Sequence, residues 1–205
     1  MRFRPTGPAA LLVEVDSLAE VRALYARIET ERAAGWGAGL TDVVPAARTV
    51  LLDGVRDQAA VAAALRSWSI APAASGSGRV VEIACSYDGP DLADVAAQWH
   101  VPPERVGAIH ASLQHEVAFC GFSPGFPYIA GLGGGHEVAR RDRPRPSVPA
   151  GSVALGDEYT GIYPRSSPGG WQIIGRTDAA MWDAGREPPA LLEPGDQVRF
   201  VDVTP

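Results

Sequence analysis

The stretch TGIYPRSSPGGWQIIGRT, Thr160–Thr177, places two short β-like runs, TGIYP and WQIIGR, on either side of a turn of serine, proline and glycine. The runs HEVAF, SVAL and QVRFVDV are arranged in the same way between His115 and Val203, with glycine and proline between them. Many short strands separated by turn signals, with no helical pattern among them, are typical of a β-barrel or a sandwich. The sequence therefore predicts a mainly β domain for the C-terminal part of the chain.

The N-terminal part predicts a small α+β domain. The run AALLVEV, Ala9–Val15, indicates a buried strand, and Ser17 and Glu20 have the spacing of a capping box before an amphipathic helix. Two short strands, TDVVPAA and RTVLLDG, follow, and Asp57 is a candidate cap for a second helix that extends to Trp68. This order of strand, helix, strand, strand and helix is most of a ferredoxin-like unit.

A linker separates the two parts. APAASGSG, Ala71–Gly78, is small and polar and holds no core-forming residue. We therefore expect a first domain of residues 1–78 and a second of residues 79–205. The second begins with a strand, RVVEIAC, followed by a helix for which Asp91 is a candidate cap and by a short helix, PPERVGAIH.

Composition excludes several classes of function. None of the 18 basic residues is lysine, so the chain holds no Walker P-loop, no Schiff-base lysine and no lysine general base. The net charge of −6 argues against nucleic acid as the main partner. No apolar run approaches the roughly 20 residues of a membrane-spanning helix, and the N-terminus does not resemble a secretory signal. Cys85 and Cys120 have neither metal nor redox spacing, which indicates a cytoplasmic protein.

Three segments concentrate glycine, proline, serine and aromatic residues: GFSPGFPYIAGL (121–132), RPRPSVPAGSVALG (143–156) and Thr160–Thr177. Binding and catalytic residues gather in loops that a rigid scaffold holds in place. We therefore expect the three segments to form one surface for a ligand or a partner. The alternative is that they are ordinary turns.

Arginine and histidine are the candidates for chemistry. Arg176 follows the strand WQIIG, where its guanidinium can receive a carboxylate or phosphate or form a structural ion pair. A run of four further arginines is either an anion-facing surface or a solvated face: Arg140, Arg141, Arg143 and Arg145. His110 ends a predicted helix, where it either interacts with the helix dipole or serves as an acid–base group.

No metal site is predicted, because His115 and His136 lack metal spacing relative to His110 and the cysteines. Cys120 adjoins the first glycine-rich segment and is interpreted as a small buried hydrophobe, with a nucleophile as the alternative.

Three long motifs, taken together, resemble a known family: IHASLQHEVAFCGFSPGFPYIAGL, RRDRPRPSVPAGSVALG and TGIYPRSSPGGWQIIGRT. They are similar to the B subunit of bacterial 5-oxoprolinase, in a family that includes proteins described as allophanate hydrolase subunit 1 and an inhibitor of a sporulation histidine kinase. They also resemble one half of the carboxyltransferase domain of urea carboxylase. The resemblance covers about Val80 to Phe200.

The resemblance implies a cyclophilin-like β-barrel after a small α+β domain. It implies a hydrolase that opens 5-oxoproline to glutamate with ATP as co-substrate, in a complex with two further 5-oxoprolinase components, the carboxyltransferase-like C subunit and the A subunit. The alternatives are a module that docks on a histidine kinase and half of a carboxyltransferase that serves a biotinylated partner. Because the chain has no lysine, biotin would have to be carried by another protein.

On the matching positions, the resemblance and the chemistry of an amide hydrolase together imply three catalytic residues: His110, Arg176 and Ser152. They imply a larger set of substrate-binding residues: Pro124, Gly125, Phe126, Arg145, Thr160, Ser167, Gly169, Gly170 and Trp171. In this interpretation, the hydroxyl groups orient the ligand, the glycines expose backbone N–H groups, Arg176 adds positive charge and His110 moves a proton.

The chain departs from the family pattern at three positions. His115 stands where tyrosine is usual, Tyr159 where glutamine is usual, and Asp178 where proline commonly follows GRT. The lost glutamine removes an amide from a loop expected to face the ligand, which leaves the identity of the substrate open.

Overall fold

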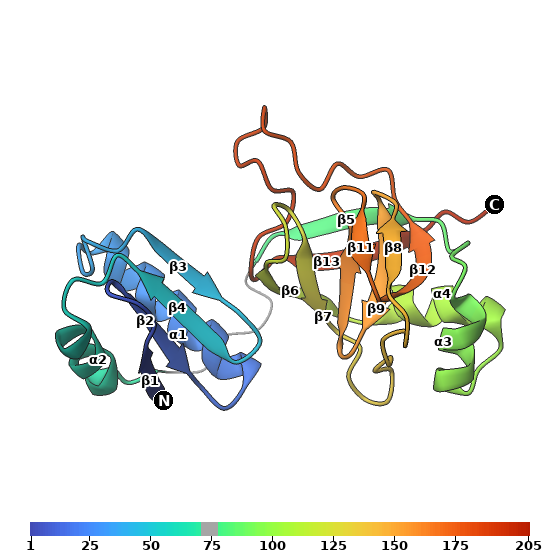
Figure 1. The fold of residues 1–205 in the computed structure, drawn as a ribbon. Coiled ribbons are helices and arrows are strands. Elements are labelled where there is room, and N and C mark those ends of the chain that lie inside the picture. Colours follow the sequence, from blue (N-terminus) through green and yellow to red (C-terminus); the bar gives the residue numbers. More distant parts are fainter. Residues whose placement is uncertain (71–77) are drawn as a thin grey trace. The chain divides into compact units, whose positions relative to one another are not determined.

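The computed structural model describes residues 1–70 and 78–205. The chain divides into two compact units, Met1–Ser75 and Gly76–Pro205. The predicted linker, Ala71–Gly78, lies almost entirely outside the described residues. Each unit is therefore considered by itself (Figure 1).

The first unit is a four-stranded antiparallel sheet with two helices. Its elements are β1 (Arg2–Pro5), β2 (Ala10–Glu14), α1 (Leu18–Ala33), β3 (Asp42–Pro45), β4 (Thr49–Asp53) and α2 (Gln58–Ser67). The strand order is β1-β2-β4-β3. Alternate residues of β2 and β4 point to one face, where Val13 and Leu52 pack with Leu24 of α1 in a fully buried core. Figure 1 shows α1 running across this sheet.

Both predicted helix caps of the first unit are confirmed. The backbone N–H of Glu20 donates to Ser17 Oγ at 3.2 Å, and Glu20 Oε2 accepts from the backbone N–H of Asp16 at 3.2 Å. Asp57 Oδ1 accepts from the N–H of Ala60 at 2.9 Å at the start of α2. These side chains satisfy N–H groups that have no partner within the helix.

The ferredoxin-like prediction for this unit is not confirmed. The four strands are adjacent in the order β1-β2-β4-β3, so β2 lies between β4 and β1, and β1 comes from the start of the chain. In a ferredoxin-like βαββαβ unit, the fourth strand follows the second helix. The prediction did not include β1.

The second unit is a barrel-like sheet with two helices. Its elements are β5 (Val80–Cys85), α3 (Leu92–Trp99), α4 (Pro103–Ser112), β6 (His115–Cys120), β7 (Pro127–Ala130), β8 (Arg145–Val148), β9 (Ser152–Gly156), β10 (Tyr159–Ile162), β11 (Ser167–Gly169), β12 (Gln172–Arg176) and β13 (Gln197–Asp202). Seven strands form one sheet in the order β12-β9-β10-β7-β6-β13-β5, and β8 and β11 pair separately.

Backbone hydrogen bonds join the two edges of the seven-stranded sheet. Ser86, directly after β5, and Arg176, at the end of β12, exchange two N–H···O bonds of 2.9 Å each. The sheet therefore closes on itself at this point, which decides between the predicted barrel and the predicted sandwich in favour of the barrel. Its parallel pair is β5 with β13, and the other pairs are antiparallel.

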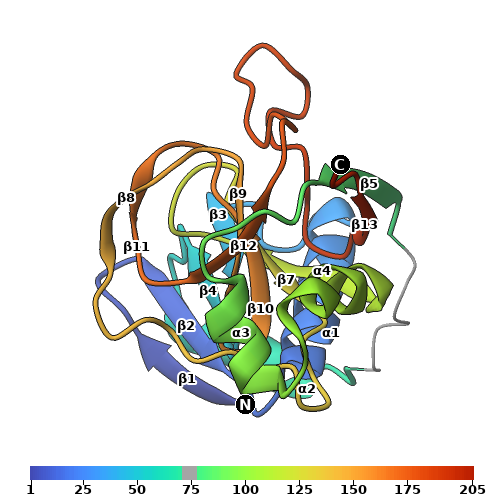
Figure 2. The ribbon, with the colours of Figure 1, turned by 90° about the vertical axis from the view of Figure 1, so that its right-hand side faces the viewer.

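The barrel interior is filled by aliphatic side chains, among them Val117, Ile129, Leu155 and Ile174, all 0% exposed. Helices α3 and α4 lie side by side, α3 against β12 and α4 against β13 (Figure 2). Pro103 is the first residue of α4, where its missing N–H leaves no helix bond unmade. No helix among the described residues is long and apolar enough to cross a membrane.

Candidate functional site

The three glycine-rich segments converge on the outer face of the barrel. Phe126, from the first segment, lies with its ring centroid 5.1 Å from that of Tyr163 and 5.7 Å from that of Trp171, both in the third segment. Further rings extend this contact into an aromatic platform, defined as Phe119, Phe126, Tyr128, Tyr159, Tyr163 and Trp171. The first and third segments therefore pack together through their aromatic residues, and β8 of the second segment pairs with β11 of the third. Five of the six rings are at most 8% exposed, and the role of the three segments as a ligand surface stays a prediction.

Two glycines let the platform rings lie directly on the sheet. A Cβ at Gly161 would lie 2.7 Å from Phe126 Cζ and 2.8 Å from Trp171 Cζ3, and a Cβ at Gly156 would lie 2.7 Å from Trp171 Cδ2. Neither glycine has positive φ. Their role is close approach of a ring to the backbone, and turn formation does not require them.

The first segment contains a tight loop that turns one aromatic side chain outward. The backbone N–H of Gly121 donates to Phe126 O at 3.1 Å, and that of Phe126 donates to Ser123 O at 3.0 Å. Phe122 has φ +64°, a conformation that costs free energy for a residue with a side chain, and it is 62% exposed. Gly125 faces the backbone of Met181 and the side chain of Trp182. A Cβ added at Gly125 would lie 2.8 Å from the Cβ of Trp182.

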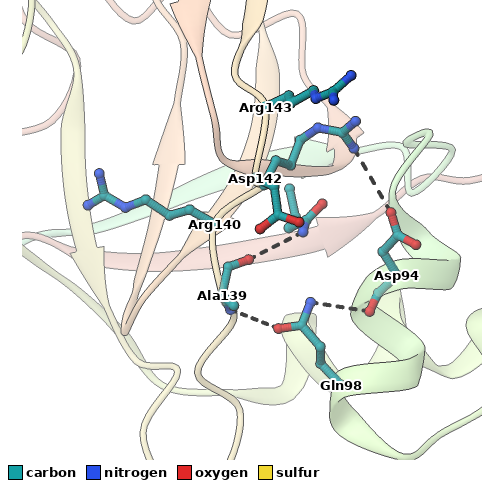
Figure 3. Close-up of a pocket in the computed structure, with 8 residues that line it drawn as sticks. Asp94, Gln98, Ala139, Arg140, Asp142 and Arg143 are labelled. Carbon is teal, nitrogen blue, oxygen red and sulfur yellow. Dashed lines mark hydrogen bonds and ion pairs between the residues drawn. The ribbon is translucent and has the colours of Figure 1, made fainter.

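A polar hollow of about 400 Å³ lies beside the platform (Figure 3). We call it the arginine hollow; it is lined by Asp94, Gln98, Ala139, Arg140, Arg141, Asp142, Arg143 and Gln172. Gln98 accepts from the N–H of Ala139 at 2.8 Å, and Gln172 Nε2 donates to Ala139 O at 3.2 Å. Two glutamines thus fix the loop that carries the arginines.

The arginines of this loop differ in how they are engaged. Arg140 binds Asp157 through Nε at 2.9 Å and Nη2 at 2.7 Å and lies 5.6 Å from the ring centroid of Trp171. Arg140 therefore joins the platform to the hollow. Arg141 binds Asp91 at 2.6 Å. Arg143 is exposed and makes no ion pair or side-chain hydrogen bond with the residues that the structure describes.

Asp91 is the buried anion behind this loop. It is 2% exposed and accepts from Arg141, from both terminal nitrogens of Arg145 at 2.9 and 2.7 Å, and from the N–H of Ile173 at 2.6 Å. Asp91 occupies the N-cap position of α3, as predicted, but its side chain makes no cap hydrogen bond, so the predicted capping role is wrong. Arg145, predicted to bind substrate, has its guanidinium bound to Asp91.

His110 and Thr160, both 0% exposed, meet inside the unit. His110 Nε2 lies 2.9 Å from Thr160 Oγ1, and its Nδ1 lies 2.8 Å from the Tyr87 hydroxyl. His115 Nε2 lies 2.8 Å from the carbonyl oxygen of His110, which identifies this nitrogen as the donor. Burial lowers the pKa of His110 well below its ordinary value, with the charge of His115 as a smaller cause. Both ring nitrogens of His110 are hydrogen-bonded within the protein, and the side chain has no contact with solvent. Its role in proton transfer stays a prediction.

Ser152 and Arg176 are partners across β9 and β12. Ser152 is 5% exposed, and its carbonyl oxygen accepts from the N–H of Tyr163 at 3.0 Å, which links this pair to the platform. The Arg176 side chain is 66% exposed, and its Nε binds Asp88 at 2.9 Å. The structure therefore brings together two of the three predicted catalytic residues, with His110 hydrogen-bonded elsewhere.

The remaining predicted positions lie around the platform. Pro124 is exposed in the first loop, and Ser167 Oγ contacts its own turn at Arg165 O, 3.5 Å away. Gly169 lies against the Tyr163 hydroxyl, which leaves no room for a Cβ, and Gly170 O accepts from the N–H of Arg141 at 2.8 Å. Their role in substrate binding stays a prediction.

Burial disfavours the thiolate form of both cysteines. Burial raises the pKa of Cys120 to about 11 and that of Cys85 to about 12, so neither forms much thiolate near neutral pH. Both are free thiols. Within residues 1–70 and 78–205, no group of three or more His, Cys, Asp or Glu side chains is placed to hold a metal ion.

Residues 1–192 match the model of the family "Carboxyltransferase domain, subdomain C and D". The chain is 45% identical over 139 residues to the B subunit of 5-oxoprolinase from Escherichia coli O157:H7, a match that covers 66% of this chain and 64% of that protein. The corresponding Bacillus subtilis (strain 168) protein is 44% identical over 129 residues, 62% of this chain and 54% of its own length. The chain thus spans between 54% and 64% of the length of these curated relatives.

Solved structures share the fold. The crystal structure of TTHA0988 is 36% identical, with a TM-score of 0.78 over 96% of this chain and 40% of that one. The urea amidolyase of Kluyveromyces lactis has a TM-score of 0.76 over 98% of this chain and 15% of its own, at 21% identity, a likeness of fold alone.

Proposed function

The chain belongs to the family of the carboxyltransferase domain, subdomain C and D, and from this premise we propose that it is the B subunit of an ATP-dependent 5-oxoprolinase. In this proposal it acts in the cytoplasm with a carboxyltransferase-like C subunit, together with an A subunit, and the assembly opens the lactam ring of 5-oxoproline to give glutamate. The support is its 45% identity to a protein named as the B subunit of 5-oxoprolinase, over 64% of that protein's length.

The observation that carries the proposal is the convergence of the three motif segments. Phe126 of the first segment packs against Tyr163 and Trp171 of the third, with all three rings at most 6% exposed. The second segment pairs with the third through β8 and β11. Segments that served only to reverse the chain would not be expected to pack against one another. Arg140 lies over the Trp171 ring at the edge of this buried cluster, and a guanidinium group suits a small amide that carries a carboxylate.

In the proposed chemistry, water attacks the lactam carbonyl carbon and the amide C–N bond breaks. The carbonyl carbon becomes the new carboxylate of glutamate, and the ring nitrogen leaves as the amine and takes up a proton, while ATP is hydrolysed to ADP and phosphate. Negative charge develops on the carbonyl oxygen as this carbon is attacked, and a nearby guanidinium stabilises it. Arg176 is our candidate for this role, because its side chain is exposed and its strand partner is Ser152. Ser152 would orient the substrate, and His110 would act through Thr160, its hydrogen-bond partner.

We place ATP on another component of the assembly. The chain has no lysine, and the arginine hollow contains the carboxylates of Asp94 and Asp142 beside its arginines. A triphosphate would meet these carboxylates with like charge. Under this proposal, the chain contributes substrate-facing groups, and phosphoryl chemistry belongs to the rest of the assembly.

Reconstitution tests the proposal. The chain is purified alone and together with the candidate A and C subunits from the same organism, and glutamate release from 5-oxoproline is followed with and without ATP. We expect release only from the complete set with ATP. A complete, correctly assembled set that releases no glutamate would overturn the proposal.

A second candidate function is docking on another protein, such as a sensor histidine kinase. It is favoured by the exposure of Phe122 at 62% and of Trp182 at 42%, in loops that touch through Gly125. Exposed aromatic side chains are enriched at protein interfaces. Kinase inhibition by the chain alone, with a reconstituted set that is inactive toward 5-oxoproline, would favour this function. A third candidate, half of a biotin-dependent carboxyltransferase, rests on the fold shared with urea amidolyase.

A further inference from the structure

The arginine hollow contains one cation that the protein itself does not neutralise. Arg140 is bound to Asp157 and Arg141 to Asp91, whereas Arg143 has no ion pair among the described residues. Figure 3 shows Arg140 and Arg143 extending to opposite sides of Asp142. A guanidinium without a partner, on a loop whose other arginines are bound, is available to an anion.

The hollow also contains an acceptor without a donor. Gln172 is 6% exposed, and its Oε1 has no hydrogen-bond partner in the described part of the chain. Its Nε2 donates to Ala139 O at 3.2 Å, which fixes the orientation of the amide and so identifies the oxygen as the unpaired atom. A buried acceptor left unpaired costs free energy, and an incoming N–H group removes that cost. Oε1 is shielded from solvent, so an N–H group can contact it only if exposed side chains of the hollow, such as Asp142, move aside.

The mixture of charges restricts the ligand. Asp94 and Asp142 line the same hollow as Arg143, so a polyanion such as a nucleotide meets two carboxylates there. A ligand with one negative charge and one N–H donor matches the lining better, because the guanidinium takes the anion while oxygen atoms take the N–H.

We propose that the arginine hollow binds a small monocarboxylate that carries an amide N–H, with Arg143 receiving the carboxylate and Gln172 Oε1 accepting from the N–H. The inference rests on the proposed function for the identity of this ligand, which is then 5-oxoproline, held at a hollow whose lining does not include Arg176 or Ser152.

The frame of the hollow is held in place before a ligand arrives, whereas the side chains of Asp142 and Arg143 are exposed. Asp91 fixes Arg141, and its other oxygen accepts from the N–H of Ile173, next to Gln172 in β12. Gln98, on α3, fixes Ala139 at 2.8 Å. Side chains held by such contacts lose little freedom on binding, which favours affinity. Asp91 is accordingly a positioning residue of this site.

The test is a binding titration of the full chain, followed by NMR of the ligand, with three probes: 5-oxoproline, 2-pyrrolidinone, which lacks the carboxylate, and inorganic phosphate. We expect saturable binding of 5-oxoproline and weaker binding of the other two. Arg143→Ala should weaken 5-oxoproline binding about tenfold or more and leave 2-pyrrolidinone unchanged, because a charge-assisted bond is lost only with the carboxylate. Gln172→Met should weaken both lactams.

The matched control is Arg105→Ala, which removes an exposed arginine of the same unit outside the hollow. Equal affinity of the Arg143→Ala and Arg105→Ala chains for 5-oxoproline would overturn the inference, as would the absence of saturable binding or tighter binding of phosphate. Activity separates this outcome from failure of the proposed function. If the reconstituted set with Arg143→Ala keeps full turnover, the proposed function stands and the proposed binding site is wrong. If 5-oxoproline binding depends on Arg143 but the reconstituted set has no turnover, the binding site stands and the proposed function is wrong.

Discussion

Asp91 holds Arg145 through two parallel hydrogen bonds of 2.7 and 2.9 Å, although 54 residues separate them in the chain. The Asp91 carboxylate is 2% exposed and the Arg145 side chain 23%, so this pair is largely withdrawn from water. It joins the start of α3 to the arginine loop and, through the N–H of Ile173, to β12. Two arginines of the run that suggests an anion site from sequence, Arg141 and Arg145, therefore bind the protein's own Asp91 and stabilise the fold.

Replacing Asp91 should destabilise the barrel unit strongly. Asp91→Ala leaves Arg141, Arg145 and the N–H of Ile173 without their acceptor, and loss of one partner of a buried pair costs about 3–5 kcal/mol. Urea unfolding of the full chain, followed by circular dichroism, measures this loss. Asp94→Ala, on the same helix, removes a carboxylate that is 64% exposed and should change the free energy of unfolding by less than about 0.5 kcal/mol. Equal effects of the two substitutions would contradict this role for Asp91.

The close packing under the platform predicts a large effect for one added methyl group. In Gly161→Ala, the new Cβ meets the rings of Phe126 and Trp171 at 2.7 and 2.8 Å, and overpacking of this kind costs about 1–3 kcal/mol. Thermal unfolding and tryptophan fluorescence report the loss and the displaced ring. Gly133→Ala is the control, because a Cβ there has nothing within 4 Å. A neutral Gly161→Ala would show that the rings do not rest on the sheet.

The buried histidines predict a loss of stability in acid. Burial lowers the pKa of both His110 and His115, so below pH 6.5 the unfolded chain binds protons that the folded chain does not. Their contribution is fully present above pH 6.5 and is lost as the pH falls toward their lowered values, by up to about 1.4 kcal/mol per pH unit for each histidine. In His110→Gln, unfolding measured between pH 7.5 and 5 should depend less steeply on pH than in the unchanged chain. An identical slope would exclude His110 as a source of the effect.

The cysteines should be slow to react in the folded chain. With pKa values raised to about 11 for Cys120 and about 12 for Cys85, little thiolate exists at pH 8. Labelling with a thiol-specific disulfide reagent should be slow without denaturant and fast for both residues in urea. Rapid labelling of Cys120 in the folded chain would restore the alternative that it is a nucleophile.

Much of the fold could be predicted because its signals are local. The caps at Ser17 and Asp57, the proline that begins α4 and the short strands with turns between them each depend on a few neighbouring residues. Strand β1 was missed because RFRP is short, charged and at the edge of its sheet. Strands β8 and β11 were missed because each contains proline and is stabilised only by pairing with the other.

The site was less predictable, because its contacts join distant segments. Asp91 had the correct spacing for a helix cap, yet Arg141 and Arg145 compete for its oxygens in the folded chain. Nothing in the sequence indicated a site role for Gln172 beyond its place in WQIIGR, or for Tyr128 beyond its aromatic ring. Only the folded barrel brings these two residues beside the loop segments. His110 was correctly placed near a helix end, but the sequence could not show that Tyr87 and Thr160 bury it.

Glutamate release by the reconstituted assembly tests the central claim most directly when Arg176 is varied. Arg176→Ala removes an exposed side chain and keeps the backbone bonds to Ser86 that close the barrel, so the chain should fold and assemble. We expect this variant to lose most of its ATP-dependent turnover of 5-oxoproline, whereas Arg105→Ala should keep the full rate. Full turnover by the Arg176→Ala assembly would contradict a catalytic role for this face of the barrel.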